Sequence, residues 1–303
     1  MMQQSFRSVE GGAWPPFGVF LSRVELKARG STMLLEFRGN VFWSQCLRLS
    51  IITLASLAFA EASAENKTNA GSDIPVDLEL VIALDVSTSM DREERLLQRD
   101  GFAAAFRDAD ILRAILSGPN RRIAVTFTEW AGTSRQNVIL EWSVVSDAAS
   151  AEALADRLDV RIPGRLPMGT SIGDAMRHAA SLFHDNGHTS QRRVIDISGD
   201  GINNSGPDPA LIRDALVAQG ITINGLPITY KPLLEGVADA VGMPLPPHYL
   251  IDYFSRAVIG GTGSFVEPVP AIEEFGAAIR RKLLREIRGS NEVAALQPGP
   301  LNR

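Results

Sequence analysis

Short apolar runs alternate with helical segments along most of this chain, and this alternation limits the fold more than any other feature. The runs that read as buried strands are residues 78–84, 122–128, 193–198 and 221–226. Parallel neighbours in a sheet need a crossover connection, which is usually a helix, so this alternation is typical of βαβ units. The sequence therefore predicts an α/β fold: a doubly wound, mostly parallel central sheet with helices on both faces.

The remaining segments complete one domain over residues 76–288. Residues 137–142 read as a short strand that we expect at an antiparallel edge, and residues 264–267 read as a last strand. Helical patterns cover residues 92–116, 147–158, 172–184, 209–219, 249–258 and 271–287. Polar, turn-rich residues 65–75 read as a linker before the domain, and residues 289–303 as a flexible tail after it.

A leader-like sequence precedes the linker. Arg38 and Arg48 stand before the apolar run of residues 49–60, and Ala-Ser-Ala follows at residues 62–64. Basic residues, a short apolar run and a small-residue cleavage pattern are typical of a secretory signal peptide. A buried helix is the alternative, but it needs neither flank. The apolar run starts late, so we interpret residues 1–64 as a mis-assigned extension (residues 1–32, with Met33 the true start) plus a signal peptide that ends near Ala64.

Export would leave an acidic domain without cysteine. The only cysteine, Cys46, precedes the apolar run and would be removed, so neither a disulfide nor a lipid-modified cysteine is expected. Residues 1–64 hold six Lys/Arg and four Asp/Glu, so their removal changes the formal charge from −5 to −7. We expect a periplasmic or extracellular protein that does not span the membrane once the leader is removed and does not bind nucleic acid.

The sequence that follows the first buried strand carries candidate metal ligands. It reads Asp-Val-Ser-Thr-Ser from Asp85 to Ser89 and leads into a helix. Residues two apart in an extended loop project to the same side, so Asp85, Ser87 and Ser89 can converge on one point. An all-oxygen set suits a hard cation such as Mg²⁺, Mn²⁺ or Ca²⁺. Serine and threonine before a helix are also common N-caps, so this run alone leaves metal binding and capping open.

Two later segments complete a recognisable pattern. Gly169-Thr170 precedes a helix, and Asp200-Gly201 follows the strand at residues 193–198. The order D-x-S-x-S, G-T, D-G resembles the metal-ion-dependent adhesion site of von Willebrand factor A (vWA) and integrin inserted domains. The resemblance implies one divalent cation, Mg²⁺ before Mn²⁺ or Ca²⁺. It also implies that Ser87 and Ser89 bind the ion directly, Thr170 directly or through water, and Asp85 and Asp200 mainly through water.

Three phrases are similar to a narrower group within that superfamily. DVSTSMDREE from Asp85, FTEWAG at residues 127–132 and VIGGTGSFVEP at residues 258–268 resemble a bacterial family of exported proteins of unknown function, DUF1194. The chain departs from the superfamily pattern at Gly199, where the common form has threonine before the aspartate. We expect metal ligation to survive this change and one supporting hydroxyl hydrogen bond to be missing.

Four further residues are candidates for the rim of a partner site. Glu129 and Trp130 follow the second strand, and Asn203 and Asn204 follow Asp200. Residues beyond the carboxyl ends of parallel strands surround the ligand site of such sheets, so these side chains are expected to contact a partner. An aromatic residue after a strand is also common in the core, so Trp130 stays open between the two.

The function predicted from these features is metal-dependent capture of a protein. Uncharged hydroxyl ligands leave a cation electrophilic, so an unidentified partner protein is expected to supply an Asp or Glu carboxylate. Two alternatives remain: an accessory vWA subunit of a larger complex, and a metal-dependent hydrolase. A phosphatase of the haloacid dehalogenase type needs a second carboxylate where Ser87 stands. The chain also has no G-x-S-x-G, H-E-x-x-H or phosphate-binding loop, so we do not expect an enzyme.

Overall fold

The computed structural model describes residues 19–28, 31–40, 73–133, 135–158, 169–231 and 248–289. The chain forms two units, Met1–Gly71 and Ser72–Arg303. Among the described residues, no helix is both long and apolar enough to cross a membrane.

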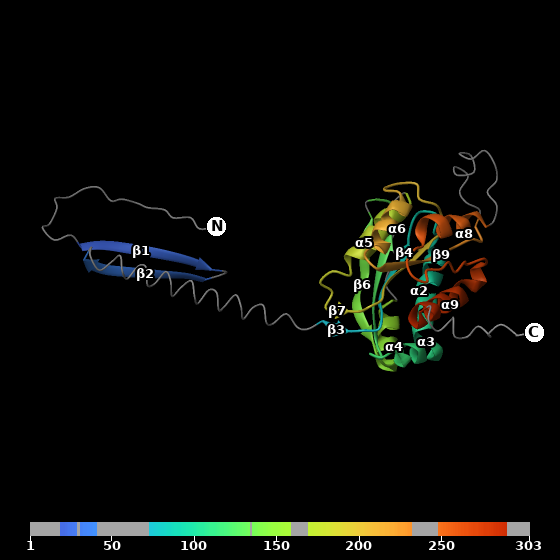
Figure 1. The fold of residues 1–303 in the computed structure, drawn as a ribbon, viewed down its shortest axis with the longest axis horizontal. Coiled ribbons are helices and arrows are strands. Elements are labelled where there is room, and N and C mark those ends of the chain that lie inside the picture. Colours follow the sequence, from blue (N-terminus) through green and yellow to red (C-terminus); the bar gives the residue numbers. More distant parts are fainter. Residues whose placement is uncertain are drawn as a thin grey trace, which may run out of the picture. The chain divides into compact units, whose positions relative to one another are not determined.

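The described part of the first unit is an antiparallel hairpin. Strand β1 (Val19–Ala28) pairs along its whole length with β2 (Ser31–Asn40), as Figure 1 shows. These strands were not predicted, because residues 1–64 were interpreted as a mis-assigned extension plus a signal peptide. The predicted apolar run of the signal peptide, residues 49–60, lies outside the described residues.

The second unit is built on one five-stranded sheet, and the sequence prediction of its class is confirmed. Its strands lie in the order β6-β5-β4-β8-β9, with β5, β4, β8 and β9 parallel and β6 antiparallel at one edge. Their bounds are β4 Glu79–Asp85, β5 Ile123–Trp130, β6 Gln136–Val145, β8 Arg193–Gly199 and β9 Ile221–Pro227. The edge strand β6 has ten residues and is longer than predicted, since its mixed, half-exposed side chains give a weak strand pattern.

The central strand β4 explains how the sheet forms. All seven of its residues are buried, which is typical of a parallel strand covered on both faces. The chain runs from β4 to β5 and β6 on one side, then crosses to β8 and β9 on the other. The strand order therefore reverses at β4, and the loops that follow β4, β5 and β8 meet beyond its carboxyl end.

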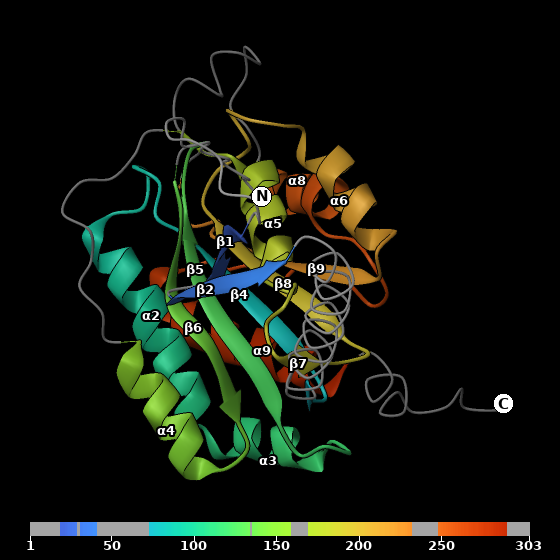
Figure 2. The same ribbon diagram turned by 90° about the vertical axis from the view of Figure 1, so that its left-hand side faces the viewer.

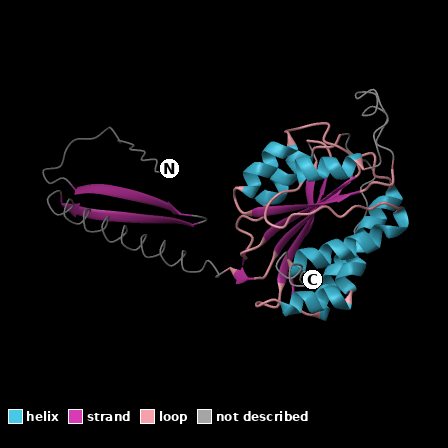
Figure 3. Ribbon diagram, turned by 45° about the vertical axis from the view of Figure 1, so that its right-hand side comes forward, coloured by secondary structure: helices cyan, strands magenta, loops and turns pink. Residues whose placement is uncertain are grey.

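Helices cover both faces of the sheet, as predicted (Figures 2 and 3). One face is covered by α2 (Arg92–Arg107), α3 (Ala109–Ser117), α4 (Ala148–Arg157) and α9 (Phe275–Arg288). The other is covered by α5 (Ile172–Ser181), α6 (Pro209–Val217), α8 (Tyr249–Tyr253) and the π-helical turn Phe254–Val258.

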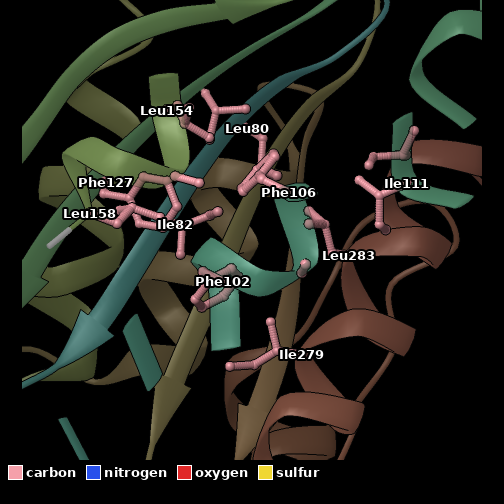
Figure 4. Close-up of a cluster of buried hydrophobic side chains, with 14 of the residues drawn as sticks. Leu80, Ile82, Phe102, Phe106, Ile111, Phe127, Leu154, Leu158, Ile279 and Leu283 are labelled. Atoms are coloured by element: carbon pink, nitrogen blue, oxygen red, sulfur yellow. The ribbon is translucent and has the colours of Figure 1, made fainter. Parts of the chain in front are cut away.

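The core between the sheet and the first helix layer is aromatic and aliphatic. Phe127 of β5 meets Phe102 of α2 edge to face, with ring centroids 5.5 Å apart. Leu80 of β4 and Ile279 and Leu283 of α9 belong to the same buried cluster, which Figure 4 shows.

Several elements differ from the sequence prediction for identifiable reasons. Asp108 divides the predicted helix of residues 92–116, because its carboxylate accepts the backbone N–H groups of Asp110 and Ile111 and caps α3. The end of the predicted linker, β3 (Ile74–Pro75), pairs with β7 (His188–Thr189). The predicted strand at residues 264–267 makes only an isolated bridge from Val266 to Gly225 of β9, since prolines at 268 and 270 lack the N–H that a ladder needs.

Because β4 is buried, we expect a leucine-to-alanine substitution there to lower the stability of the protein far more than the same substitution on an exposed helix. Leu80→Ala should lower the free energy of unfolding by about 2–5 kcal/mol, because Leu80 is fully buried and its removal leaves a cavity. Leu211→Ala on α6, where the leucine is 69% exposed, should change it by less than about 0.5 kcal/mol. Urea unfolding of both variants checks this, and equal losses would contradict the assigned core.

Candidate metal centre

The loop after β4 is held by hydrogen bonds of Asp85 and Asp91, and its serines do not cap the following helix. Asp85 ends β4, is fully buried, and accepts the backbone N–H of Ser87 through Oδ1 at 2.7 Å. Helix α2 is capped by Asp91, whose Oδ1 accepts the backbone N–H of Glu94 at 2.9 Å while the Glu94 carboxylate accepts that of Asp91. Because this capping box is complete, neither Ser87 nor Ser89 is the N-cap of α2.

Hydroxyl groups then link this loop to the one after β8. Ser87 Oγ lies 3.0 Å from Ser89 Oγ, and the Ser89 hydroxyl donates to Asp200 Oδ1 at 2.6 Å. Asp200 directly follows β8, the neighbour of β4 in the sheet. The structure therefore brings together four of the five residues that the sequence proposed as metal ligands: Asp85, Ser87, Ser89 and Asp200.

The fifth, Thr170, lies on a loop held at the same edge of the sheet. Its backbone N–H donates to Asn204 Oδ1 at 2.8 Å, and its carbonyl accepts the N–H of Asn204 at 3.0 Å. The N–H of Ser171 donates to the carbonyl of Ala131, just after β5, at 2.9 Å. Within the described part of the chain, the hydroxyl of Thr170 makes no hydrogen bond to the other four residues.

The two carboxylates at this edge are short of hydrogen-bond donors. Oδ2 of Asp85 and Oδ2 of Asp200 are both buried without a hydrogen-bond partner. Burial, and after it the negative charge of Asp200, raises the pKa of Asp85 to about 8. Burial also raises the pKa of Asp200, against the hydrogen bond from Ser89 and the charge of Lys231, which lower it. A cation between these groups would offset the cost of burying them.

The donors present fit a hard divalent cation. Two serine hydroxyls and two carboxylates give only oxygen ligands, the chemistry that Mg²⁺, Mn²⁺ and Ca²⁺ prefer. Residues 73–289, as far as they are described, contain no group of three His, Cys, Asp or Glu placed to hold a metal. A cation at this site would therefore depend on the hydroxyl groups as well as on the two aspartates.

Gly199, the departure from the superfamily pattern, lies against Asp85. A Cβ atom at this position would stand 3.3 Å from Asp85 Oδ2 and 3.5 Å from the Trp130 ring. These contacts are tight, so a threonine here would require its neighbours to move slightly. Glycine lets Trp130 pack against the end of β4 instead.

The sequence analysis missed two charged residues of this site, Lys231 and Glu94. Lys231 Nζ donates to the carbonyl of Ser89 at 2.7 Å, forms an ion pair with Glu94 and lies 3.7 Å from Asp200 Oδ2. Tyr230 donates its hydroxyl to Glu94 Oε1 at 2.5 Å. Position beyond a strand was the available signal, since Lys231 follows β9 by four residues.

Two of the four rim candidates, Glu129 and Trp130, are buried, and for Trp130 this favours the core alternative. Trp130 is fully buried in the core and donates its indole N–H to the carbonyl of Ala83 at 3.2 Å. Glu129 is 2% exposed and forms a buried ion pair with Arg99. Position after a strand located both residues at the correct edge, but it could not show that other segments cover them.

Asn203 and Asn204 lie nearer the surface, but their side chains hydrogen-bond to the backbone of a neighbouring loop. Asn204 is exposed, and its amide oxygen holds the backbone of Thr170. Asn203 is half-buried, and its amide oxygen accepts the N–H of Ile172 at 2.8 Å. Both residues therefore position the loop that carries Thr170, and only Asn204 also offers exposed surface.

The strand order and the three loop segments at the carboxyl edge of the sheet define a vWA-type domain. The chain belongs to DUF1194, a family described as protein of unknown function, whose model matches residues 75–291. No protein with a curated description matches the chain.

Several solved structures are similar to this one. Proximal thread matrix protein 1 from the mussel byssus, with a zinc-occupied MIDAS motif, is 13% identical, with a TM-score of 0.48 over 71% of this chain and 49% of that protein. The pilus adhesin SpaC from Lactobacillus rhamnosus GG is 14% identical, with a TM-score of 0.49 over 71% of this chain and 30% of that one. BatB from Bacteroides thetaiotaomicron is 22% identical, with a TM-score of 0.43 over 70% and 100%. The chain thus spans about half the length of the mussel protein.

The raised pKa values of the two aspartates predict how the metal-free protein responds to pH. Both folded-state pKa values lie above the ordinary value, so the contribution of the two groups to stability is full below about pH 4 and falls as pH rises. For Asp85 it is lost as pH rises through about 8. Asp200→Asn removes one of the two charges, so at about pH 8 it should leave the protein as stable as wild type or more stable, with a flatter pH dependence.

Urea unfolding in EDTA at about pH 5 and pH 8 measures this. A large loss of stability in the Asp200→Asn protein at both values would instead identify Asp200 as a structural hydrogen-bonding residue.

Proposed function

We propose that this domain is an exported, metal-dependent protein-binding module. One divalent cation, Mg²⁺ before Mn²⁺ or Ca²⁺, would be held by Ser87, Ser89 and Thr170, with Asp85 and Asp200 acting mainly through water. The observation that carries the proposal is that Asp85 and Asp200 each have a buried Oδ2 atom without a hydrogen-bond partner. Their Oδ1 atoms accept the Ser87 N–H and the Ser89 hydroxyl, and the two serine hydroxyls lie 3.0 Å apart.

The residues around the cation would set its chemistry. Asp85 orients Ser87 through the backbone N–H of that residue, and Asp200 orients the Ser89 hydroxyl. When bound, the ion supplies an electrophilic position for an oxygen anion, because the hydroxyl ligands bring no negative charge. An Asp or Glu side chain of a partner protein is the anion that such a position accepts best.

Selection among acidic partners must come from the surface around the site, because one carboxylate does not distinguish one protein from another. Thr88 lies between the two serine ligands and is exposed, as is Asn204 on the loop after β8. Asn204 is therefore kept as a proposed contact, and Thr88 replaces Glu129 and Trp130.

Two other functions are less well supported. A hydrolase of the serine–histidine type needs a histidine beside its nucleophile, but His178 bonds to Thr128 Oγ1, at 3.1 Å, and to none of the serines of the site. An accessory subunit of a larger complex would use the same metal-dependent contact. Finding the protein outside the cytoplasm would favour a free binding module, and constant association with one assembly would favour a subunit.

Thermal unfolding with metal and with EDTA tests the site. A saturating divalent cation should stabilise the wild-type protein by about 2.7 kcal/mol at a hundredfold excess over Kd. Asp85→Ala and Ser87→Ala should lose this gain. Asp174→Ala is the matched control, because Asp174 accepts the Ser171 hydroxyl at 3.0 Å and pairs with Arg177 on α5. Capture of partners from the exported fraction should follow the same order, and a partner that binds fully in EDTA would remove the metal from the mechanism.

We expect the charge of Lys231 to weaken metal binding at this site. Its ammonium group already lies beside Asp200 and would repel an incoming cation, so Lys231→Met should raise the affinity for Mg²⁺ by about tenfold or more. Lys231→Arg keeps the charge and should leave the affinity near that of wild type. Calorimetric titration of both variants checks this. Weaker binding in Lys231→Met, restored in Lys231→Arg, would show that the lysine orders the Ser89 carbonyl rather than competing with the metal.

A further inference from the structure

A polar cavity lies at the opposite edge of the sheet from the metal centre. It has a volume of about 370 Å³ and is lined by the amino ends of β8 and β9, the loop at residues 261–263 and the end of α9. Ligand sites for small molecules begin at about this size. The metal centre lies beyond the carboxyl ends of the same strands, so the two sites share no residue.

We propose that this cavity binds a small soluble anion that carries phosphate or carboxylate groups. Four arginines line it: Arg192, Arg193, Arg285 and Arg288. None of the described carboxylates forms a salt bridge within 4.0 Å of any of the four. In contrast, eight other arginines of the domain form such pairs, namely Arg99, Arg107, Arg113, Arg135, Arg177, Arg213, Arg280 and Arg281.

Two of the four arginines, Arg192 and Arg193, are held in place by backbone carbonyl groups. Arg192 donates to the carbonyls of Glu286 and Ile287 at the end of α9, the second at 2.9 Å, and Arg193 donates to the carbonyl of Gln219. Carbonyl oxygens orient a guanidinium group but leave its charge in place. In a chain of formal charge −5, four such groups around one cavity are a local excess of positive charge.

Arg285 is held by an aromatic ring. Its guanidinium lies 3.9 Å from the centroid of the buried Phe265 ring, which also lines the cavity. Stacking occupies the flat face of the group and leaves its N–H donors to point sideways. A guanidinium presented edge-on can bind two oxygens of one phosphate or carboxylate at once.

The one acidic residue of the lining, Glu286, is held by groups of the core. The Glu286 side chain is fully buried, forms an ion pair with Lys282 and accepts a hydrogen bond from Asn224 at 3.0 Å. Lys282 also pairs with Asp196 at 2.6 Å, so these groups form a buried network inside the core. The carboxylate of Glu286 therefore hydrogen-bonds within the core and forms no salt bridge with the cavity arginines, although its charge acts on Arg192.

Calorimetric titration of the full chain with pyrophosphate and with citrate tests the proposal. Both anions bind divalent cations, so the titrations are made in EDTA, which also separates this site from the metal centre. At least one anion should bind, and the better one identifies phosphate or carboxylate as the preferred group. Affinity should fall as salt is added.

Matched arginine substitutions then locate the binding. Arg285→Ala and Arg288→Ala should each weaken binding by about tenfold, the effect of losing a charged hydrogen-bonding partner. Arg157→Ala is the control, because it removes the same charge from exposed α4, away from the cavity. The proposal is overturned if neither anion binds, or if the control weakens binding as much as the two cavity variants. Binding only to vesicles of an anionic phospholipid would also overturn it.

Discussion

The burial of β4 is the constraint on which the rest of the domain depends. The strand is covered on both faces, and every one of its residues is buried, including its last, Asp85. A carboxylate is thereby placed at the end of a buried strand. Its negative charge destabilises the fold there unless hydrogen-bond donors or cations surround it. The loops after β4 and β8 meet that need with hydroxyls and N–H groups, but two carboxylate oxygens still lack hydrogen-bond partners.

Charge is distributed unevenly along this sheet. At the carboxyl edge, Asp200 and Glu94 face Lys231, and the charge of Asp200 acts on the neighbouring Asp85. In the core, Asp196 and Glu286 share Lys282, and burial with the charge of Asp196 raises the pKa of Glu286 to about 7. At the amino edge, four arginines line one cavity and form no salt bridge with a described carboxylate, although the charges of Glu286 and Asp77 act on Arg192, and Arg193 acts on Glu79. One edge is therefore suited to bind cations and the other to bind anions, although the chain as a whole is acidic.

Lys231 gives the proposed metal centre a feature that its motif does not show. The D-x-S-x-S, G-T and D-G segments describe ligands, whereas Lys231 acts on their charge and on the carbonyl of Ser89. Membership of DUF1194 does not assign a role to this lysine, because the family description names no function. The effect on metal affinity that we propose for it rests on its distance to Asp200.

The sequence by itself determined the class of fold. It also proposed five site residues, of which the structure brings four together. Apolar runs separated by helices require a parallel sheet, and residues that follow neighbouring strands of such a sheet must meet at one edge. Only the tertiary structure decided what surrounds them. Trp130 and Glu129 are covered by segments distant in sequence, and Lys231 reaches Glu94 across more than a hundred residues. Short β3 and β7 pair only because the chain brings them together. Such contacts depend on how separate segments pack, and local patterns of apolar and polar residues carry no record of that packing.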